Sequence, residues 1–401
     1  MRKLATEKRS RGHRKHMQDQ EGASMTGLIV HEWIERRGGS ENVLEAIAAA
    51  YPDAPVLTPW SNAPERLTGH DVRQSILART PVRRSKPLAA LVLPLAWRTM
   101  VPTGTQYEWV IASSHLFSHH VRVPGRDGPA PKFVYVHSPA RYIWNPDLDA
   151  RGANLLARTA SSVLKPLDRR RAQEARRIAA NSAFVRDRIK STWGRDSTVI
   201  HPPVDVDRVR RLAAAPEQLG DAERSALEQI PEVFLLGASR FVSYKQLDRA
   251  IEVGEAADLP VVLAGGGPEE IALRARAAEA TVPVYFVLEP TDAMLASLYA
   301  RAAALVFLAI EDFGIMPVEA MATGTPVLAR RLGGTAETVI DGRTGIFIED
   351  ESATGIRASV NRLLTLDRAP VASHADRFST AMFESRLKAW VQEGLTDGAL
   401  S

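Results

Sequence analysis

The sequence contains no cysteine, which excludes disulfide frameworks, cysteine-based zinc sites, iron–sulfur clusters and thiol nucleophiles. It also lacks any run of about 18 apolar residues, the length that a membrane-spanning helix needs. The stretch that comes closest, residues 87–96, is short and contains Pro94. Because a chain without cysteine forms no disulfides that need an oxidising compartment, and because it has no such span, we expect a cytoplasmic protein.

A strong excess of either charge is missing too, because 51 Lys and Arg face 47 Asp and Glu. The first 24 residues hold seven basic residues against three acidic ones, which accounts for the net charge of +4 and leaves a neutral body. We therefore expect no nucleic-acid partner, since a basic footprint should belong to the folded part. Residues 1–24 are polar and predict a basic, disordered tail, with Met25 an equally good start of the native chain.

Short apolar runs alternate with helical patterns from Met25 onward, which is typical of parallel strands joined by crossover helices. Pro202 and Pro203 deny helix and predict an extended connection between two domains. We expect an α/β fold of two doubly wound, Rossmann-like domains with a cleft between them, over residues 25–204 and 205–378, and a terminal helix in 379–401 that crosses back to the first domain. The expected strands are 28–31, 107–112, 133–136, 177–180, 198–201, 233–238, 261–264, 284–287, 304–308, 326–329 and 345–348.

Two glutamates eight positions apart, Glu311 and Glu319, follow an apolar strand and accompany a short helix. This places both carboxylates near the carboxyl edge of a sheet, where open α/β folds bind ligands. Each carboxylate can accept hydrogen bonds from neighbouring hydroxyls, so the pair could hold a sugar ring and a ribose separately. The backbone N–H groups of Phe313, Gly314 and Ile315, at a helix start, suit an anionic group between them. A solvated acidic loop is the competing interpretation.

This segment resembles the Glu-x7-Glu signature of the retaining glycosyltransferases of family 4, which have the two-domain GT-B fold. Residues 237–251 are similar to the family's Arg-x4-Lys pattern, and the resemblance implies that Arg240 and Lys245 grip the donor diphosphate. Two positioned cations would stabilise a leaving group that gains negative charge on its phosphate. Gln246 stands where the family normally has glycine, which should make the turn less permissive.

The first half of the chain carries two further matches to that family. Gly38 and Gly39 resemble its first glycine loop and could bring backbone N–H groups against a phosphate or an acceptor, although a plain turn is an alternative. Residues 135–144 resemble a histidine segment of bacterial mannosyltransferase-like members, in which the histidine lies at the donor sugar. His137 would then donate a hydrogen bond to a sugar hydroxyl, unless it only caps the end of its strand.

The resemblance implies a retaining enzyme that moves a hexose from a nucleotide sugar to a hydroxyl of a polysaccharide or a lipid-linked glycan. Glu311 and His137 would be the catalytic groups at the sugar, and Glu319 would bind the ribose. GDP-mannose is the first donor to test, and neither a metal nor any other cofactor is implied. Two alternatives stay open: a sugar-nucleotide epimerase of the same fold, and a non-catalytic module that binds nucleotide sugars.

Two other patterns carry weaker predictions. His115 and His119 have the one-turn spacing of a helical metal pair, but no acidic ligand is near them in sequence, which favours ordinary polar histidines. The basic residues of 79–86 precede an apolar, tryptophan-containing stretch that ends at Trp97. That combination suits peripheral contact with the inner face of a membrane, while a buried helix with a solvated flank is the alternative.

Overall fold

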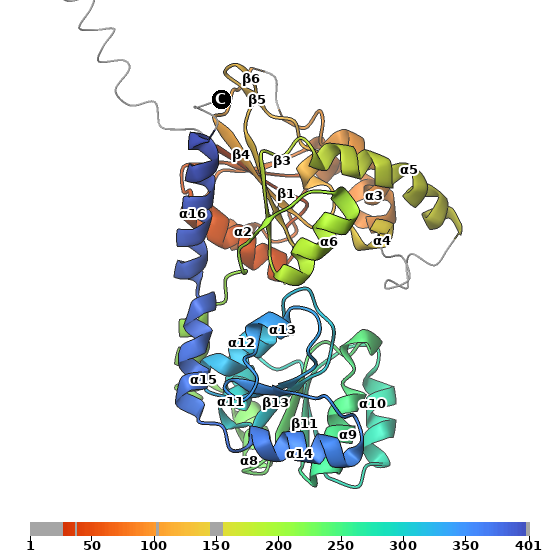
Figure 1. The fold of residues 1–401 in the computed structure, drawn as a ribbon, viewed down its shortest axis with the longest axis vertical. Coiled ribbons are helices and arrows are strands. Elements are labelled where there is room, and N and C mark those ends of the chain that lie inside the picture. The colour runs from red at the N-terminus through yellow and green to blue at the C-terminus, as the bar shows by residue number, and fades with distance from the viewer. Residues whose placement is uncertain (1–26, 37, 102–103, 145–154, 398–401) are drawn as a thin grey trace, which may run out of the picture.

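The computed structural model describes residues 27–36, 38–101, 104–144 and 155–397. Most of its strands form two separate parallel sheets, one in each of the two bodies that Figure 1 shows one above the other. The expected α/β architecture of two doubly wound domains is therefore confirmed. The tail over residues 1–24 lies outside the described residues.

The first sheet has seven strands in the order β3-β2-β1-β4-β7-β8-β9, and every neighbouring pair is parallel. All residues of β1, β4 and β7 are buried, as expected of strands covered by helices on both faces. The strands are β1 (Gly27–His31), β2 (Val56–Thr58), β3 (Val72–Gln74), β4 (Trp109–Ser114), β7 (Lys132–Val136), β8 (Arg177–Ala180) and β9 (Thr198–Val199). A small antiparallel hairpin, β5 (Pro124–Gly125) with β6 (Gly128–Pro129), stands apart.

Two of these strands, β2 and β3, were not expected from the sequence. Each has three residues, which is too short for a periodic pattern, and β3 is a partly exposed edge strand. The main helices of this domain are α2 (Gly39–Ala50), α3 (Lys86–Ala96), α4 (Arg141–Trp144), α5 (Leu155–Ala172) and α6 (Ala183–Trp193). Helix α6 shows how local sequence sets the bounds: the Ser182 hydroxyl accepts a hydrogen bond from the Val185 N–H, and Gly194 ends the helix with a positive φ of 67°.

The second sheet has six parallel strands in the order β12-β11-β10-β13-β14-β15. They are β10 (Leu235–Ala238), β11 (Val261–Gly265), β12 (Val284–Leu288), β13 (Ala304–Phe307), β14 (Val327–Ala329) and β15 (Gly345–Phe347), each within two residues of its expected position. Helices on both sides complete the domain: α7 (Val206–Ala213), α8 (Asp221–Glu228), α9 (Asp248–Ala257), α10 (Glu270–Ala278), α11 (Asp292–Arg301), α12 (Ile315–Ala322), α13 (Thr335–Thr338), α14 (Ala353–Leu363) and α15 (Arg368–Ala375).

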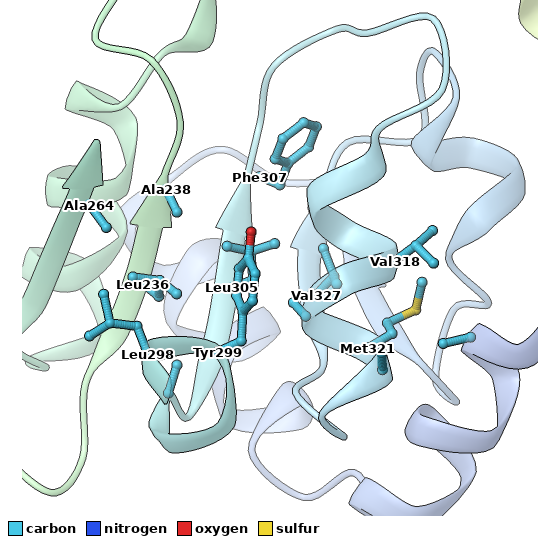
Figure 2. Close-up of a cluster of buried hydrophobic side chains, with 14 of the residues drawn as sticks. Leu236, Ala238, Ala264, Leu298, Tyr299, Leu305, Phe307, Val318, Met321 and Val327 are labelled. Atoms are coloured by element: carbon cyan, nitrogen blue, oxygen red, sulfur yellow. The ribbon is translucent and has the colours of Figure 1, made fainter. Parts of the chain in front are cut away.

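The second domain has two apolar clusters, one of which lies between its sheet and helices α11 and α12, while the other includes residues of α9 and α14. Figure 2 shows Leu298 and Tyr299 of α11 and Met321 of α12 beside the strand residues that they cover. All of these apolar side chains are buried, which fixes α12 tightly on the sheet. Since α12 follows the loop that carries Glu311, the core holds one side of the candidate site in place.

The chain passes between the domains twice, at two points that lie side by side. Val204, just after the predicted proline connection, donates its N–H to the carbonyl of Phe378 at 2.9 Å and forms a bridge with Ser379. Helix α16 (Thr380–Thr396) then runs along the first domain, where it contacts α2. Its buried side chains belong to the same apolar cluster as residues of β1, β4 and β7: Phe383, Leu387, Trp390 and Val391.

Candidate active site

The loop between β13 and α12 carries Glu311, and α12 itself carries Glu319. Gly314 precedes α12 with a φ of 90°, a conformation that favours glycine, and turns the chain into the helix. Gly334 donates its N–H to the carbonyl of Glu311 at 2.8 Å. A Cβ on the neighbouring Gly333 would lie 2.6 Å from the same carbonyl oxygen, so only glycine allows this approach. The loop is thereby pinned against the segment that follows β14.

Glu311 and Glu319 lie in different surroundings. The carboxylate of Glu311 forms an ion pair with the ammonium of Lys245. Glu319, on α12, accepts a hydrogen bond from the Tyr299 hydroxyl at 3.1 Å, and burial raises the pKa of this carboxyl group above its ordinary value. Of the two, Glu311 is the one in direct contact with a cation of the Arg-x4-Lys segment.

The predicted cation pair lies in the turn after β10. Arg240 donates to the Tyr244 hydroxyl at 2.8 Å, and Lys245 is largely buried beside Glu311, with 10% of its side chain exposed. Burial lowers the pKa of Lys245 to about 8, and the positive charges of Arg240 and Arg141 act in the same direction. The ion pair with Glu311 opposes this effect and favours the ammonium form.

Gln246 shows why glycine would suit this turn. Its φ is 54°, in the left-handed region that a side chain disfavours by about 1 kcal/mol. Its side-chain oxygen accepts a hydrogen bond from Arg330 at 3.0 Å, which helps to hold the residue in that conformation. The departure from the family pattern therefore leaves the geometry of the turn intact.

The glycine loop of the first domain faces the second domain. A Cβ on Gly39 would lie 3.0 Å from the Cδ1 atom of Ile315, so the start of α2 lies against the start of α12 where the two domains meet. A Cβ on Gly38 would lie 2.1 Å from the carboxylate of Glu41. That carboxylate accepts hydrogen bonds from the Glu35 N–H at 3.1 Å and the Ser40 hydroxyl at 2.8 Å. At both positions a Cβ would meet the far end of a flexible side chain, which would have to shift, and neither glycine has a strained φ.

The side chain of Phe313 does not face the cleft. It is buried in the core of the second domain, where it contacts the rings of His201 and Phe378. Any contribution of Phe313 to ligand binding must therefore come from its backbone N–H, which is the group that the sequence prediction used.

His137 follows β7 and belongs to a chain of hydrogen bonds. Its Nε2 atom lies 2.8 Å from the Ser113 hydroxyl, which lies 3.0 Å from Nδ1 of His31. Burial lowers the pKa of His137 well below its usual range, and the neighbouring His115 and His31 add to the shift. The imidazole is therefore neutral at physiological pH and can act through hydrogen bonds rather than through charge.

Glu32 is a buried residue that the sequence prediction did not include. Its carboxylate accepts hydrogen bonds from the backbone N–H groups of Leu116 at 2.9 Å and Ser118 at 2.7 Å. Burial opposes ionisation, but His115, His31 and these N–H groups hold the pKa of Glu32 below its ordinary value. An acidic residue directly after a buried strand was the signal available in the sequence. Glu32 fixes the loop that places His115 beside His31 and His137, with ring centroids 5.7 and 6.2 Å away.

The helical histidine pair is not formed. His119 lies on a short 3-10 turn, residues 118–120, and it joins His120 and Asp168 instead of His115. Asp168 accepts hydrogen bonds from His120 Nε2 at 3.1 Å and from the indole N–H groups of Trp144 and Trp193, both at 2.7 Å, while His119 Nε2 lies 3.0 Å away. Burial opposes ionisation, but the two histidines hold the pKa of Asp168 far below its ordinary value. These hydrogen bonds explain the cluster as a structural link between α4, α5 and α6.

Two carboxylates of the second domain contact the first domain. Asp312 forms ion pairs with Arg141 and, at 2.8 Å, with Arg188. Glu337 of α13 accepts the N–H of Ala183, at the start of α6, at 2.8 Å, and lies 3.0 Å from Nε2 of His201. Neither contact was expected, because no local pattern marks a residue that meets its partner more than 100 positions away. Both hold the Glu311 loop and its neighbour α13 close to the first domain.

Two protein-family models together match most of this chain. Residues 37–208 match the model for "Glycosyltransferase Family 4", and residues 222–381 match the model for "Glycosyl transferases group 1". A GDP-mannose-dependent alpha-(1-6)-phosphatidylinositol monomannoside mannosyltransferase of Mycolicibacterium smegmatis is 30% identical over 222 residues, 51% of this chain and 57% of that relative. A D-inositol 3-phosphate glycosyltransferase of Segniliparus rotundus is 29% identical over 57% of this chain and 54% of its own.

The chain thus spans about half the length of the curated relatives that it matches. Among solved structures, Anabaena HepE in complex with UDP superposes with a TM-score of 0.64 over 92% of this chain and 100% of its own, at 18% identity. A sucrose-phosphate synthase of Thermosynechococcus elongatus superposes with a TM-score of 0.59, at 18% identity, over 94% of this chain and 98% of its own. Both likenesses concern the fold. The chain belongs to the group 1 glycosyltransferases, with a family 4 first domain and the GT-B fold.

Proposed function

We propose that the protein is a retaining glycosyltransferase that moves a hexose from a nucleotide sugar to a hydroxyl of a polysaccharide or lipid-linked glycan. The observation that carries the proposal is the pairing of Lys245 with Glu311 at the domain interface, with Arg240 in the same turn and Gly39 opposite the start of α12. This arrangement offers cations to a diphosphate and a carboxylate to sugar hydroxyls within one cleft.

Each group has a distinct task in this proposal. Lys245 turns from Glu311 to the diphosphate when the donor binds, and Arg240 supports it, so that both cations stabilise the charge of the leaving phosphate. The freed carboxylate of Glu311 accepts hydrogen bonds from sugar hydroxyls. The N–H groups at Gly314 and Ile315, at the start of α12, face the same anionic region.

The remaining groups set the position of the donor. Glu319 has one oxygen engaged by Tyr299, and its other oxygen accepts from the ribose. Neutral His137 hydrogen-bonds a sugar hydroxyl from the first domain, since its Nε2 is engaged by Ser113 and Nδ1 is the other polar atom of the ring. Gly38 and Gly39 let the first domain approach the donor closely. No metal or other cofactor takes part in this proposal.

The donor is tested by thermal unfolding of the wild type with UDP, GDP, ADP and TDP sugars. GDP-mannose is the first candidate, because the mycobacterial relative is named as GDP-mannose-dependent. A donor at about 100 times its dissociation constant should add about 2.7 kcal/mol to the stability of the protein. We expect one donor to raise the melting temperature of the wild type, and Arg240→Ala and Glu319→Ala to lose that rise.

Arg274→Ala is the matched control, because Arg274 is an exposed arginine of α10 that pairs with Glu270. This variant should keep the full donor response. If no nucleotide sugar stabilises the wild type, or if Arg240→Ala and Glu319→Ala respond as the wild type does, the donor site is wrong. Product analysis separates the alternatives, since an epimerised nucleotide sugar formed without an acceptor would identify an epimerase.

Peripheral contact with a membrane is the second part of the proposal. Among the residues that the structure describes, no helix is long and apolar enough to cross a membrane. Helix α3 buries Ala89 and Leu93 on one face, so the expectation of a buried helix is only half right. Its other face exposes leucines at helical spacing, at 40%, 58% and 70%, after two exposed arginines of the preceding turn: Leu88, Leu91, Leu95, Arg83 and Arg84. Such a surface suits an anionic bilayer.

Sedimentation with vesicles tests this contact. We expect binding to phosphatidylglycerol vesicles that falls at least about fivefold in Leu91→Glu, because the substitution places a charge in the apolar stripe. Ile271→Glu is the control, since Ile271 is an isolated apolar side chain of α10 that is 84% exposed. Equal binding of both variants, or equal binding of the wild type to neutral phosphatidylcholine, would contradict the proposed surface.

A further inference from the structure

The contact between the two domains holds more positive charge than the Arg-x4-Lys pair supplies. Arg141 and Arg188 reach from the first domain to Asp312, whose chain neighbour Glu311 is paired with Lys245. The charge of Arg141 also extends to Lys245, because it is among the groups that lower the pKa of that lysine. Arg141 therefore lies in the same electrostatic cluster as the cations of the second domain.

The charges in this cluster do not cancel. The cluster contains four cations and two carboxylates, which leaves a net charge of +2: Arg141, Arg188, Arg240 and Lys245, with Glu311 and Asp312. The diphosphate of a nucleotide sugar is doubly negative. A ligand of that charge would neutralise the cluster, whereas a neutral sugar would leave it unbalanced.

The two arginines of the first domain differ in how firmly they are held. Arg188 is 13% exposed, donates to the Ser138 hydroxyl at 2.8 Å, and lies over the ring of Phe184. Arg141 is 42% exposed, and Asp312 is the carboxylate that it contacts. Arg188 alone can keep Asp312 neutralised, so Arg141 is the arginine that can exchange its partner at little cost.

We propose that Arg141 is a donor-binding residue that leaves Asp312 and contacts the diphosphate of the nucleotide sugar, as a third phosphate cation supplied by the first domain. This inference rests on the proposed function and adds a residue to it. Because Arg141 begins α4 in the first domain and Lys245 lies in the second, the diphosphate joins the two domains. Donor binding and closure of the cleft are then one event.

The test is isothermal titration of GDP and UDP into the wild type, Arg141→Gln, Arg141→Lys, Asp312→Asn and the double variant Arg141→Gln/Asp312→Asn. We expect Arg141→Gln to raise the dissociation constant of the nucleotide that the wild type binds by about 10- to 30-fold. This is the effect of losing a charged hydrogen bond. Arg141→Lys should recover part of that affinity, since it keeps the charge. The Asp312→Asn variant should bind the nucleotide as well as the wild type or more tightly, because Asp312 no longer competes with the diphosphate for Arg141.

The double variant separates a phosphate contact from an interdomain ion pair. If Arg141 acted only by holding Asp312, Asp312→Asn would weaken binding as much as Arg141→Gln, and the double variant would be no weaker than either. That result would overturn the inference. In our proposal, Arg141→Gln weakens nucleotide binding by a similar factor whether it is made in the wild type or in the Asp312→Asn variant.

The inference and the proposed function fail in different ways. If Lys245→Ala loses nucleotide binding while Arg141→Gln keeps wild-type affinity, the donor site is correct and the role of Arg141 is wrong. If the wild type binds none of the nucleoside diphosphates or their sugars, the proposed function itself is wrong.

Discussion

Replacing Lys245 with alanine is expected to lower kcat/KM for the donor by a factor of about 100 to 1000, the loss seen when one group that stabilises developing charge is removed. Lys245 is the largely buried cation beside Glu311, so its ammonium acts where water screens charge poorly. Its effect should be largest in the transition state, because the phosphate gains charge as the glycosidic bond breaks. The measurement is the initial rate of donor hydrolysis or transfer, using the donor that stabilises the wild type.

The dependence of this activity on pH provides the control. Since burial lowers the pKa of Lys245 to about 8 and the ion pair with Glu311 opposes that shift, the ammonium is present at neutral pH and is lost as the pH rises from about 8 toward the ordinary pKa of lysine. Wild-type kcat/KM should therefore fall above about pH 8, by up to tenfold per pH unit. Lys245→Arg keeps its charge throughout this range, so its profile should stay flat up to pH 10. A fall at the same pH in Lys245→Arg would assign the titration to another group.

Replacing Asp168 with alanine is expected to destabilise the first domain by about 3 to 5 kcal/mol, because buried N–H groups would lose their shared acceptor. The indoles of Trp144 and Trp193 and the imidazole of His120 all donate to this carboxylate. The measurement is urea unfolding followed by tryptophan fluorescence, to which Trp144 and Trp193 contribute among the seven tryptophans of the chain. Asp168→Asn keeps one acceptor oxygen and should lose less stability than alanine.

Asp187→Ala is the matched control for Asp168. The side chain of Asp187 is 72% exposed and pairs with the adjacent Arg186, so its loss should change stability by less than about 0.5 kcal/mol. Equal losses in the two variants would contradict the structural role of the Asp168 cluster. A chelator that destabilises the wild type as much as Asp168→Ala does would show instead that the cluster holds a metal.

The fold and the two motif segments of the candidate site follow from local patterns in the sequence. Buried parallel strands are continuous apolar runs, which is why every strand of the second sheet lies within two residues of its expected position. The Glu-x7-Glu and Arg-x4-Lys segments could be located because each motif lies in one short stretch. The contact between Lys245 and Glu311, which joins two such stretches, required the structure.

Features that depend on distant contacts could not be predicted. The interdomain partners of Asp312 and Glu337 come from segments more than 100 residues away, and neither residue differs locally from an exposed acid. The edge strand β3 gains its conformation from β2 rather than from its own sequence. At Gln246 the sequence would predict a change in the turn, because a side chain disfavours the left-handed conformation. The residue nevertheless adopts that conformation, and its hydrogen bond with Arg330 helps to hold it there.

The position of α16 makes the first domain discontinuous in sequence. Phe383, Leu387 and Trp390 fill a cluster whose other members come from strands and helices synthesised hundreds of codons earlier, whereas the second domain is contained in one uninterrupted stretch. A ribosome therefore exposes the first sheet long before the helix that covers it is made. On the nascent chain the second domain can complete its core first, and the first domain keeps an apolar face open until the residues of α16 have emerged.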